Sequence, residues 1–274
     1  MSNRARNANQ GLPPEEKPDR PSAELENVEE FPPSEREEIG RLAARALRRG
    51  ADVPGRVQKG PTCGLYALGM VMDYWETRDA SATTVLVQES DDFRPGSHSM
   101  PPDNHAMLLD IARTRGYTTE GEMFYADQLA ALAREFGYQA VVYEDFSLAT
   151  LIAVLERKRP CLIGFDVDDE GNPGEFEGLN AHWAVIESHF EKDGERFLVA
   201  SHAWSGGEYV WKAAEFMKSV GQLEKGNTDA MPSVPADISK TLKQRLVEVY
   251  REGYVPVKPK RKRGKRKEKD STPT

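Results

Sequence analysis

The sequence predicts an α+β fold in which a helical N-terminal half packs on a C-terminal antiparallel sheet. Three observations support this class. Apolar residues recur at helical spacing in four segments between residues 34 and 136. From residue 138 onward the pattern changes to short apolar runs typical of buried strands. Two of these runs are joined across Lys192-Asp193-Gly194, a turn that fits a hairpin and therefore makes the two strands antiparallel.

The first expected helix is amphipathic. Ser34 and Glu37 form a capping box ahead of an apolar stripe from residue 39 to residue 47, and Gly50 ends the segment. We expect this helix to pack on the outside of the domain, and a partner-binding helix is the alternative interpretation. Further helices are predicted over residues 63–75, 103–115 and 126–136.

The sheet is expected to contain residues 138–143, 160–166, 182–186 and 197–200. A strand around Tyr209 and Trp211 should follow and pass into a short helix. One more helix is predicted over residues 148–158. A last helix is predicted over residues 238–250, because apolar side chains recur there at helical spacing, namely Leu242, Leu246, Val249 and Tyr250.

The composition predicts one domain with polar extensions. The chain has 274 residues, 38% of them hydrophobic and 30% charged, which is enough for one sizeable core. We expect a disordered lead over residues 1–32, a folded domain over 33–252 and a disordered basic tail over 253–274. No apolar run has the length of a membrane span, and no apolar segment follows the basic residues near the N-terminus. A cytoplasmic location is therefore expected.

The tail concentrates positive charge on an otherwise acidic chain. Residues 258–269 hold nine Lys or Arg and one Glu, a net of +8, so with −8 for the whole chain the remainder carries −16. Such a tail could bind nucleic acid, an acidic partner or an anionic membrane surface, or be a solvated extension. No aromatic residue lies among the basic ones, so nothing indicates sequence-specific reading of bases.

The stretch from Gln58 to Trp75 places a cysteine at the start of an apolar helix. Gly60 and Pro61 break any regular element, and Thr62 is expected to cap the helix that follows. Cys63 then lies in the first turn, where the helix dipole favours thiolate and lowers the pKa of the thiol from about 8.5. We therefore interpret Cys63 as a nucleophile, with a buried core cysteine as the alternative.

Two neighbours of Cys63 fit this chemistry. The side-chain amide of Gln58 and the backbone N–H of Cys63 could together hold the oxygen that becomes negative when a carbonyl is attacked. Gly64 is a poor helix former, so it needs a packing or functional reason, such as room for a substrate.

His182 is the candidate general base. It begins an apolar strand after a glycine-containing loop, so its ring is expected at the sheet edge that faces the start of the Cys63 helix. There it could take the thiol proton to form a thiolate–imidazolium pair and return the proton to the leaving amine. A structural histidine is the alternative. Trp183 is expected to shield this pair or to belong to the core.

Two segments resemble a known family. The first resembles the nucleophile segment of the actin maturation protease family and, more loosely, of the bacteriocin-leader-processing peptidases, both papain-like, through Gln58, Gly60, Pro61, Cys63, Gly64, Leu65, Ala67 and Leu68. The second, residues 181–185, resembles the family's histidine strand. Residues 201–223 resemble the piece that follows, so the similarity spans about residues 55 to 225. It implies a papain-like fold and limited processing of a protein N-terminus.

The third catalytic member departs from the family pattern. Papain-like enzymes commonly orient the base with Asn or Asp, whereas residues 201–206 of this chain contain neither. If Gly206 matches the family glycine, His202 occupies the orienting position, where the actin maturation proteases have Gln. An imidazole brings no negative charge, so a weaker enzyme is expected. Ser201 or Asp166 could substitute.

The other candidate sites are interpreted as structural. Cys161 lies in a fully apolar run where burial keeps a thiol inert, and a disulfide with Cys63 would inactivate the nucleophile. His98 and His105 are seven residues apart with no cysteine nearby, so no metal or other cofactor is expected. Residues 79–102 form a long polar loop that could be a substrate-facing lid.

The pattern as a whole predicts a cysteine peptidase that hydrolyses peptide bonds of a protein or peptide substrate through Cys63 and His182. An acyltransferase or deamidase of the same fold is the first alternative. The second is a catalytically inactive papain-like binding module, which the departure at His202 keeps open.

Overall fold

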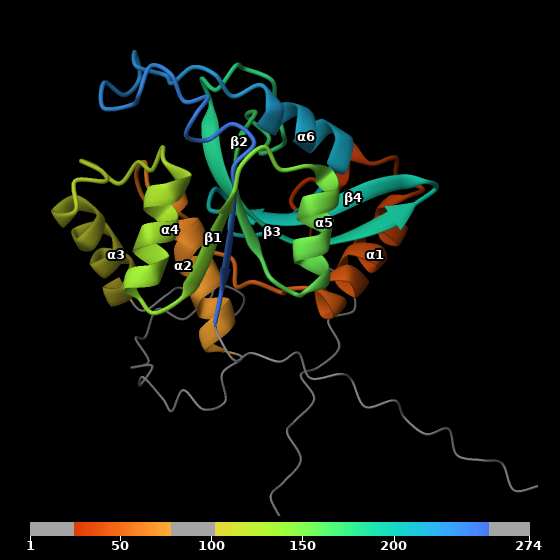
Figure 1. Cartoon of the computed structure of the whole chain (residues 1–274). Coiled ribbons are helices and arrows are strands. Elements are labelled where there is room, and N and C mark those ends of the chain that lie inside the picture. The colour runs from red at the N-terminus through yellow and green to blue at the C-terminus, as the bar shows by residue number, and fades with distance from the viewer. Residues whose placement is uncertain (1–24, 78–101, 252–274) are drawn as a thin grey trace, which may run out of the picture.

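The computed structural model describes residues 25–77 and 102–251, without the side chains of residues 102–106 (Figure 1). The predicted lid over 79–102 falls outside this part of the chain, apart from the backbone of residue 102. His98, the side chain of His105 and the basic tail from residue 253 also lie outside it. What was predicted for these segments stays a prediction.

Six strands form one antiparallel sheet in the order β1-β6-β2-β3-β4-β5. Every pair of neighbours is antiparallel, and β3 and β4 form the long hairpin predicted across residue 193. The strands are β1 (Gln139–Tyr143), β2 (Cys161–Asp166), β3 (Ala181–Lys192), β4 (Glu195–His202), β5 (Glu208–Lys212) and β6 (Leu246–Tyr250).

Helices cover both faces of the sheet, so the described part is a three-layer α+β structure (Figure 1). Val185 of β3 packs with α2, α3 and α4, whereas its neighbour Ala184 packs with α5 and α6, because successive strand residues point to opposite faces. The helices are α1 (Arg36–Arg49), α2 (Cys63–Glu76), α3 (Pro102–Thr114), α4 (Ala126–Glu135), α5 (Leu148–Glu156) and α6 (Ala213–Gly221), with a 3-10 turn at Val28–Glu30.

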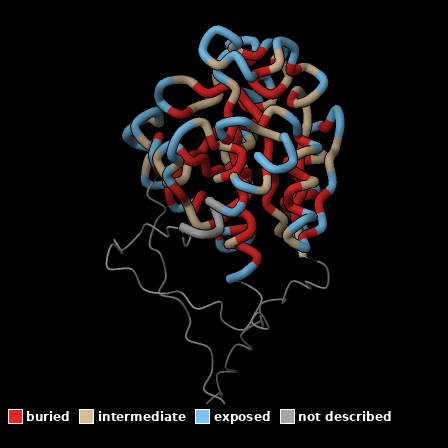
Figure 2. Tube along the Cα trace, turned by 90° about the vertical axis from the view of Figure 1, so that its left-hand side faces the viewer, coloured by how far each residue is buried: buried red, intermediate tan, exposed pale blue. Residues whose placement is uncertain are grey.

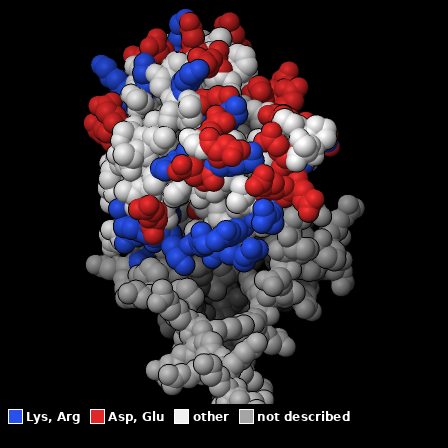
Figure 3. Space-filling view, turned by 90° about the vertical axis from the view of Figure 1, so that its right-hand side faces the viewer, with Lys and Arg blue, Asp and Glu red and all other residues white. Residues whose placement is uncertain are grey.

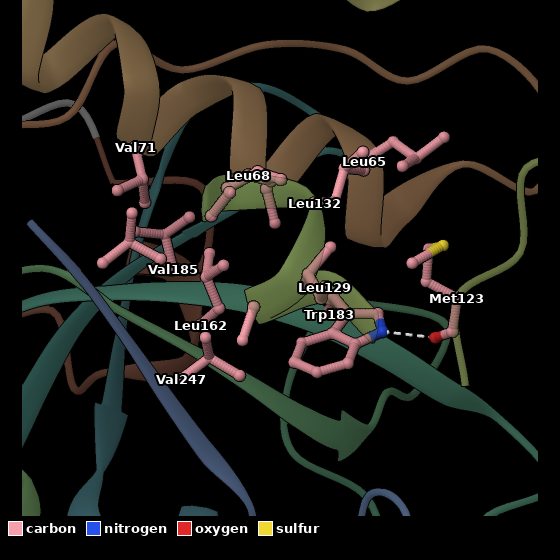
Figure 4. Packing of buried hydrophobic residues seen from close by; sticks show 14 of the residues in the cluster. Leu65, Leu68, Val71, Met123, Leu129, Leu132, Leu162, Trp183, Val185 and Val247 are labelled. Atoms are coloured by element: carbon pink, nitrogen blue, oxygen red, sulfur yellow. Dashed lines mark hydrogen bonds between the residues drawn. The ribbon is translucent and has the colours of Figure 1, made fainter. Parts of the chain in front are cut away.

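Helix α2 is the centre of the larger core. Leu65, Leu68, Met72 and Trp75 recur at roughly helical spacing and are all buried. Met70 and Val71 are buried as well, so the helix is surrounded by protein on most sides. Figure 4 shows α2 contributing Leu65, Leu68 and Val71 to a cluster with α4 and the sheet. Figure 2 shows buried segments running through the middle of the molecule, where α2 and the central strands lie. The predicted helix over 63–75 is therefore confirmed.

Helix α1 packs against the sheet as predicted. Ile39, Ala43 and Leu47 are buried against side chains of β4 and β5, and Gly50 follows the last turn. The predicted capping box is wrong: the helix starts at Arg36 after Glu35, and no side chain caps it. The chain reaches Ser34 as part of a turn, too early to accept a bond from the first helical N–H groups.

The last predicted helix, over 238–250, is wrong. Residues 246–250 form β6, which inserts between β1 and β2 and pairs with both. Leu246 and Val247 are adjacent yet both buried, because helices cover both faces of the sheet. The helical spacing of the apolar residues was coincidental, and two partner strands distant in sequence decide the conformation.

The predicted lead is shorter than residues 1–32. Leu25 is buried and bridges to Glu208 beside β5, and the side chain of Asn27 donates to the Val210 carbonyl at 2.9 Å and accepts from its N–H at 3.0 Å. The segment from Leu25 onward therefore belongs to the folded domain. Among the described residues, no helix has both the length and the apolar character needed to cross a membrane.

A buried carboxylate holds β6 to its neighbours. The side chain of Glu248 is 1% exposed, and it pairs with Arg159 at 2.7 Å and Arg157 at 3.1 Å and accepts from the Tyr143 hydroxyl at 2.7 Å. Burial alone would raise the pKa of Glu248, but these hydrogen bonds and charges outweigh burial and lower it. The ionised carboxylate of Glu248 therefore stabilises the fold at pH values above the pKa that it has in the unfolded chain. This contribution is lost as the pH falls through its lower pKa in the folded protein.

We predict that Glu248→Gln lowers the free energy of unfolding by about 1–3 kcal/mol at pH 7, because it weakens charge-assisted hydrogen bonds in a buried site. The deficit should shrink as the pH falls below the unfolded-state pKa of a glutamate, about 4.3, because the carboxylate's contribution is lost between that value and its lower pKa in the folded protein. Urea denaturation at several pH values measures this. Glu224→Gln is the matched control, since Glu224 forms an exposed pair with Lys243 and should show no comparable loss. An equal deficit at pH 3.5 and pH 7 would contradict the prediction.

Candidate active site

Cys63 is the first residue of α2, as predicted. The predicted cap is absent, because the Thr62 hydroxyl donates to the Lys59 carbonyl at 2.7 Å and accepts no bond from the helix. Thr62 thus stabilises the turn that precedes the helix. The backbone N–H groups at the start of α2 keep no side-chain cap and remain available to a ligand.

The segment before Cys63 is fixed by close backbone contact with the loop after β4. The Gln58 N–H donates to the Ala203 carbonyl at 2.6 Å. A Cβ atom on Gly55 would lie 1.8 Å from the Gly206 carbonyl oxygen, and Gly206 has a φ of +80°, so both positions need glycine. Arg56 adds a buried ion pair to Asp73 of α2. These contacts hold Gln58 beside the helix start.

One cavity brings the predicted residues together. Gln58, Cys63 and His182 all line a cavity of about 200 Å³ between the start of α2 and the start of β3. The other residues that line it are Pro61, Glu122, Met123, Phe124, Ala181, Trp183 and Leu242. The walls are mostly apolar, with Glu122 as the one acidic side chain in this set.

His182 is buried in aromatic surroundings. Its ring lies 5.2 Å from the ring of His202 and 5.8 Å from that of Trp204, centroid to centroid, and Trp204 stacks on it at 29°. Within the described structure, Nε2 of His182 has no hydrogen-bond partner. Burial lowers the pKa of His182 to about 3, and the neighbouring His202 adds to the shift. The imidazole is therefore neutral at pH 7.

The three candidates for the third member differ in their surroundings. His202 is fully buried, its ring lies edge-on to His182, and neither ring nitrogen has a partner of normal hydrogen-bond geometry in the described structure. Burial lowers the pKa of His202 to about 4, with a backbone contact from Gly171 opposing the shift. Ser201 instead donates to Glu187 at 2.5 Å. Of the three candidates, His202 is therefore the one whose side chain lies against the His182 ring.

Asp166 is committed elsewhere. Its carboxylate accepts backbone N–H bonds from Phe176 at 2.9 Å, Gly178 at 2.8 Å and Asn180 at 3.0 Å, and a further bond from the Gln222 side chain. It therefore anchors the loop that leads into the histidine strand, and none of its hydrogen bonds in the described structure goes to His182.

The predicted depression of the Cys63 pKa is wrong for this structure. Burial raises the pKa of Cys63 to about 11, although the backbone amides of Trp183, Gly64 and Cys63 itself act in the opposite direction. The thiol is therefore neutral at pH 7. Because Cys63 as a whole residue is only partly buried and lines the cavity, a ligand can still reach it. Desolvation by the packed cavity walls outweighs the partial charge of the helix end.

The predicted ion pair between Cys63 and His182 is therefore absent from the resting structure. The thiol favours its protonated form and the imidazole its neutral form at pH 7. No hydrogen bond joins the two side chains in the part of the chain that the structure describes. Contacts of this kind often tighten only when a substrate is bound.

Gly64 has a packing reason. A Cβ atom there would lie 2.9 Å from Cβ of Met123 and 3.0 Å from the Trp183 ring. The indole N–H of Trp183 donates to the Met123 carbonyl at 2.6 Å, the bond drawn in Figure 4. Trp183 is 2% exposed and belongs to the core, and it also lines the cavity with Cys63 and His182, so both of its predicted roles stay open.

The structure adds cavity residues that the sequence did not indicate. Glu122, Met123 and Phe124 come from the connection between α3 and α4, and Leu242 comes from the segment before β6. None of them lies in a recognisable motif. Trp204 was visible beside His202 in the sequence, and an aromatic residue so close to a candidate orienting residue was the available signal.

Cys161 is fully buried in β2, and burial raises its pKa well above the ordinary value, as predicted for a core cysteine. Both cysteines are free thiols. Among the described residues, no group of three or more His, Cys, Asp or Glu side chains is placed to hold a metal ion.

We predict that iodoacetamide alkylates Cys63 and not Cys161, because only Cys63 lines a cavity. The rate at Cys63 should rise about tenfold per pH unit between pH 7 and 10, since thiolate is the reactive form and the pKa is about 11. Mass spectrometry of the digested protein measures both sites. A rate already constant above pH 7 would show a resting thiolate and refute the assignment of a neutral thiol.

Comparison with known proteins connects this site to one family. Residues 96–190 match the family model described as actin maturation protease-like, C-terminal domain. That range includes His182 and ends before His202, and Cys63 lies upstream of it.

Curated relatives agree. The chain is 33% identical over 139 residues to an actin maturation protease of Xenopus tropicalis, covering 49% of this chain and 39% of the relative. It is 33% identical over 144 residues to the Homo sapiens protein, covering 49% and 34%, and 29% identical over 174 residues to the Drosophila melanogaster protein, covering 62% and 55%. The chain thus spans between about a third and just over half of these relatives. The chain is similar to the actin maturation proteases over about half of its length, and the resemblance to that family predicted from its sequence is confirmed.

Proposed function

We propose that this chain is a cysteine peptidase of papain-like fold, with Cys63 as the nucleophile and His182 as the general base. The observation that carries the proposal is the shared cavity: a cysteine at the start of a buried helix and a histidine at the start of a central strand line the same space of about 200 Å³. The relatives, which are named as proteases, support the same class of reaction.

The proposed reaction starts from neutral groups. Cys63 attacks the peptide carbonyl carbon while its proton passes to His182, so the S–C bond forms as the S–H bond breaks. The imidazolium then gives the proton to the leaving amine as the C–N bond breaks. A water molecule hydrolyses the resulting thioester with His182 again acting as base. Because both groups are neutral at rest, proton transfer occurs with attack and not before it.

Gln58 and the start of α2 are the proposed oxyanion hole. Gln58 lines the cavity, and its Nε2 donates to the Gly60 carbonyl at 3.2 Å, which is long and leaves the amide able to turn toward a substrate. The Cys63 N–H at the uncapped helix end supplies a second donor. Negative charge that develops on the carbonyl oxygen would be stabilised by the helix dipole as well.

His202 is the proposed orienting residue. It has the ring contact with His182, whereas Ser201 and Asp166 are bound to other groups. A neutral imidazole can accept a hydrogen bond from His182 but adds no negative charge, so the imidazolium gains less than it would from a carboxylate.

The substrate class that fits is a protein cleaved at a limited site. The cavity is small and apolar, with room for one side chain near the scissile bond and not for a long peptide. Processing of a protein N-terminus is what the family resemblance implies, and the name of the relatives specifies actin for those proteins.

One observation favours the inactive binding module as the second candidate. The thiol and the imidazole are both neutral and share no hydrogen bond, so nothing in the resting site is already activated. In that case the cavity would hold a peptide without cleaving it. Activity measurements separate the two candidates directly.

We predict that the full chain cleaves members of a peptide library and that Cys63→Ala lowers the rate by at least about 1000-fold, because removal of a nucleophile leaves little residual catalysis. Mass spectrometry detects cleavage, and the same data reveal deamidation or amine transfer. Cys161→Ala is the matched control and should retain activity, since Cys161 is buried in β2. If neither wild type nor control produces any of these reactions, the peptidase proposal is contradicted.

We predict that His202→Ala lowers kcat by roughly 10- to 100-fold, less than the 10²- to 10⁴-fold attributed to a general base itself. His202→Gln should restore part of the loss, because an amide can also accept the hydrogen bond from His182. Ser201→Ala is the control, since that hydroxyl is bound to Glu187. Stopped assays across pH 6–9 measure kcat and its pH profile. An unchanged kcat and pH profile in His202→Ala would exclude His202 as the orienting residue.

A further inference from the structure

A second cavity, outside the candidate active site, lies between α1 and the β3–β4 hairpin. Its volume is about 310 Å³, larger than the cavity that holds Cys63. It is lined by Leu42, Arg45, Ala46 and Arg49 of α1, His189, Phe190 and Glu191 of β3, and Arg196 of β4. None of these residues has a role in the proposed peptidase chemistry.

Three arginines from two elements converge on this cavity. Arg45 and Arg49 are one turn apart on α1, so their side chains share a face of the helix. Arg196 comes from the opposite wall and is paired with Glu191 at 3.2 Å. Among the described residues, no ion pair neutralises Arg45 or Arg49. The cavity thus holds three positive side chains and one negative one.

The surroundings strengthen the attraction for an anion. Leu42, Ala46 and Phe190 form an apolar floor, which lowers the local dielectric constant compared with open water. His189 is half-buried, and burial together with the charge of Arg196 lowers its pKa, so its ring is neutral and can donate a hydrogen bond to an acceptor. Arginine is the side chain best suited to bidentate binding of a carboxylate.

The location of this positive charge is not explained by composition. The chain carries a net charge of −8. Figure 3 shows the side of the molecule on which α1 and the hairpin lie, and a band of basic side chains crosses its lower part below a mixed, largely acidic region. Cations in the last turn of α1 offset the helix dipole, which accounts for Arg48 and Arg49 but not for Arg45 or Arg196.

We propose that this cavity is a docking site for a carboxylate-rich peptide segment of a partner protein. The two arginines without an ion pair, Arg45 and Arg49, can each bind one acidic side chain, and Arg196 is already paired with Glu191. An extended nucleic acid is a poorer fit, because the basic residues line a small pocket and the rest of the chain is acidic and would repel a polyanion. The proposal does not depend on the peptidase assignment.

The test is binding of a fluorescent peptide that contains six consecutive glutamates to the full chain, followed by anisotropy. A peptide with six glutamines is the uncharged control. The double variant Arg45→Gln/Arg49→Gln should bind roughly tenfold more weakly, since two charged contacts are lost. Arg41→Gln is the matched control, because Arg41 lies on the same helix and does not line the cavity. The basic tail is present in every variant, so its contribution is common to all.

Glu191→Gln gives a second readout of opposite sign. Loss of this carboxylate frees Arg196, so the glutamate peptide should bind several-fold more tightly, roughly the strength of one exposed ion pair. The proposal is overturned if Arg41→Gln weakens binding as much as the double variant, or if Glu191→Gln leaves binding unchanged. It is also overturned if inorganic phosphate binds with the same dependence on Arg45 and Arg49 while the glutamate peptide does not, since the cavity would then be a phosphate site.

Discussion

The close contact between the first turn of α2 and the start of β3 is the constraint on which the site depends. Gly64 brings the helix against the Trp183 ring at a distance that no side chain would allow, and the bond from Trp183 to the Met123 carbonyl fixes the ring in turn. The residue before each partner in this contact, Cys63 and His182, is thereby placed in one cavity. A packing requirement and a chemical one are therefore met by the same few residues, which explains why glycine follows the cysteine.

The same contact has an electrostatic cost. Cavity walls that bring Cys63 and His182 together also remove both from water, which raises the pKa of the thiol to about 11 and lowers that of the imidazole to about 3. Three backbone amides act in the other direction, those of Cys63 and Gly64 at the start of α2 and that of Trp183 in β3, but their effect is smaller than that of burial. In the proposed reaction, the Cys63 thiol therefore stays protonated at rest and loses its proton only as it attacks a bound carbonyl.

The sequence was sufficient where local chemistry decides the structure. The start of α2 followed from Gly60 and Pro61, and the β3–β4 hairpin from Asp193-Gly194. Prediction from the sequence failed where residues distant in the chain determine the conformation. Residues 246–250 have an apolar spacing compatible with a helix, and only pairing with β1 and β2, each about 80 or more residues away in the chain, makes them a strand. The pKa of Cys63 belongs to the same class, because burial raises it and the cavity around Cys63 is lined by residues distant in sequence, such as Met123 and Trp183.

Helix α1 shows how one element can satisfy two interpretations that looked exclusive in the sequence. Its apolar residues, such as Ile39 and Ala43, are buried against β4 and β5, so this face of the helix is not accessible to a partner. Arg45 and Arg49 lie on a different face of α1, beside the β3–β4 hairpin, and they are not part of this apolar packing. An exposed charged face normally needs only to be solvated. Here the face borders a cavity with a third arginine from β4, which is paired with Glu191, whereas Arg45 and Arg49 have no ion pair among the described residues. The proposed anion site therefore uses the outer face of α1, and its inner face is core.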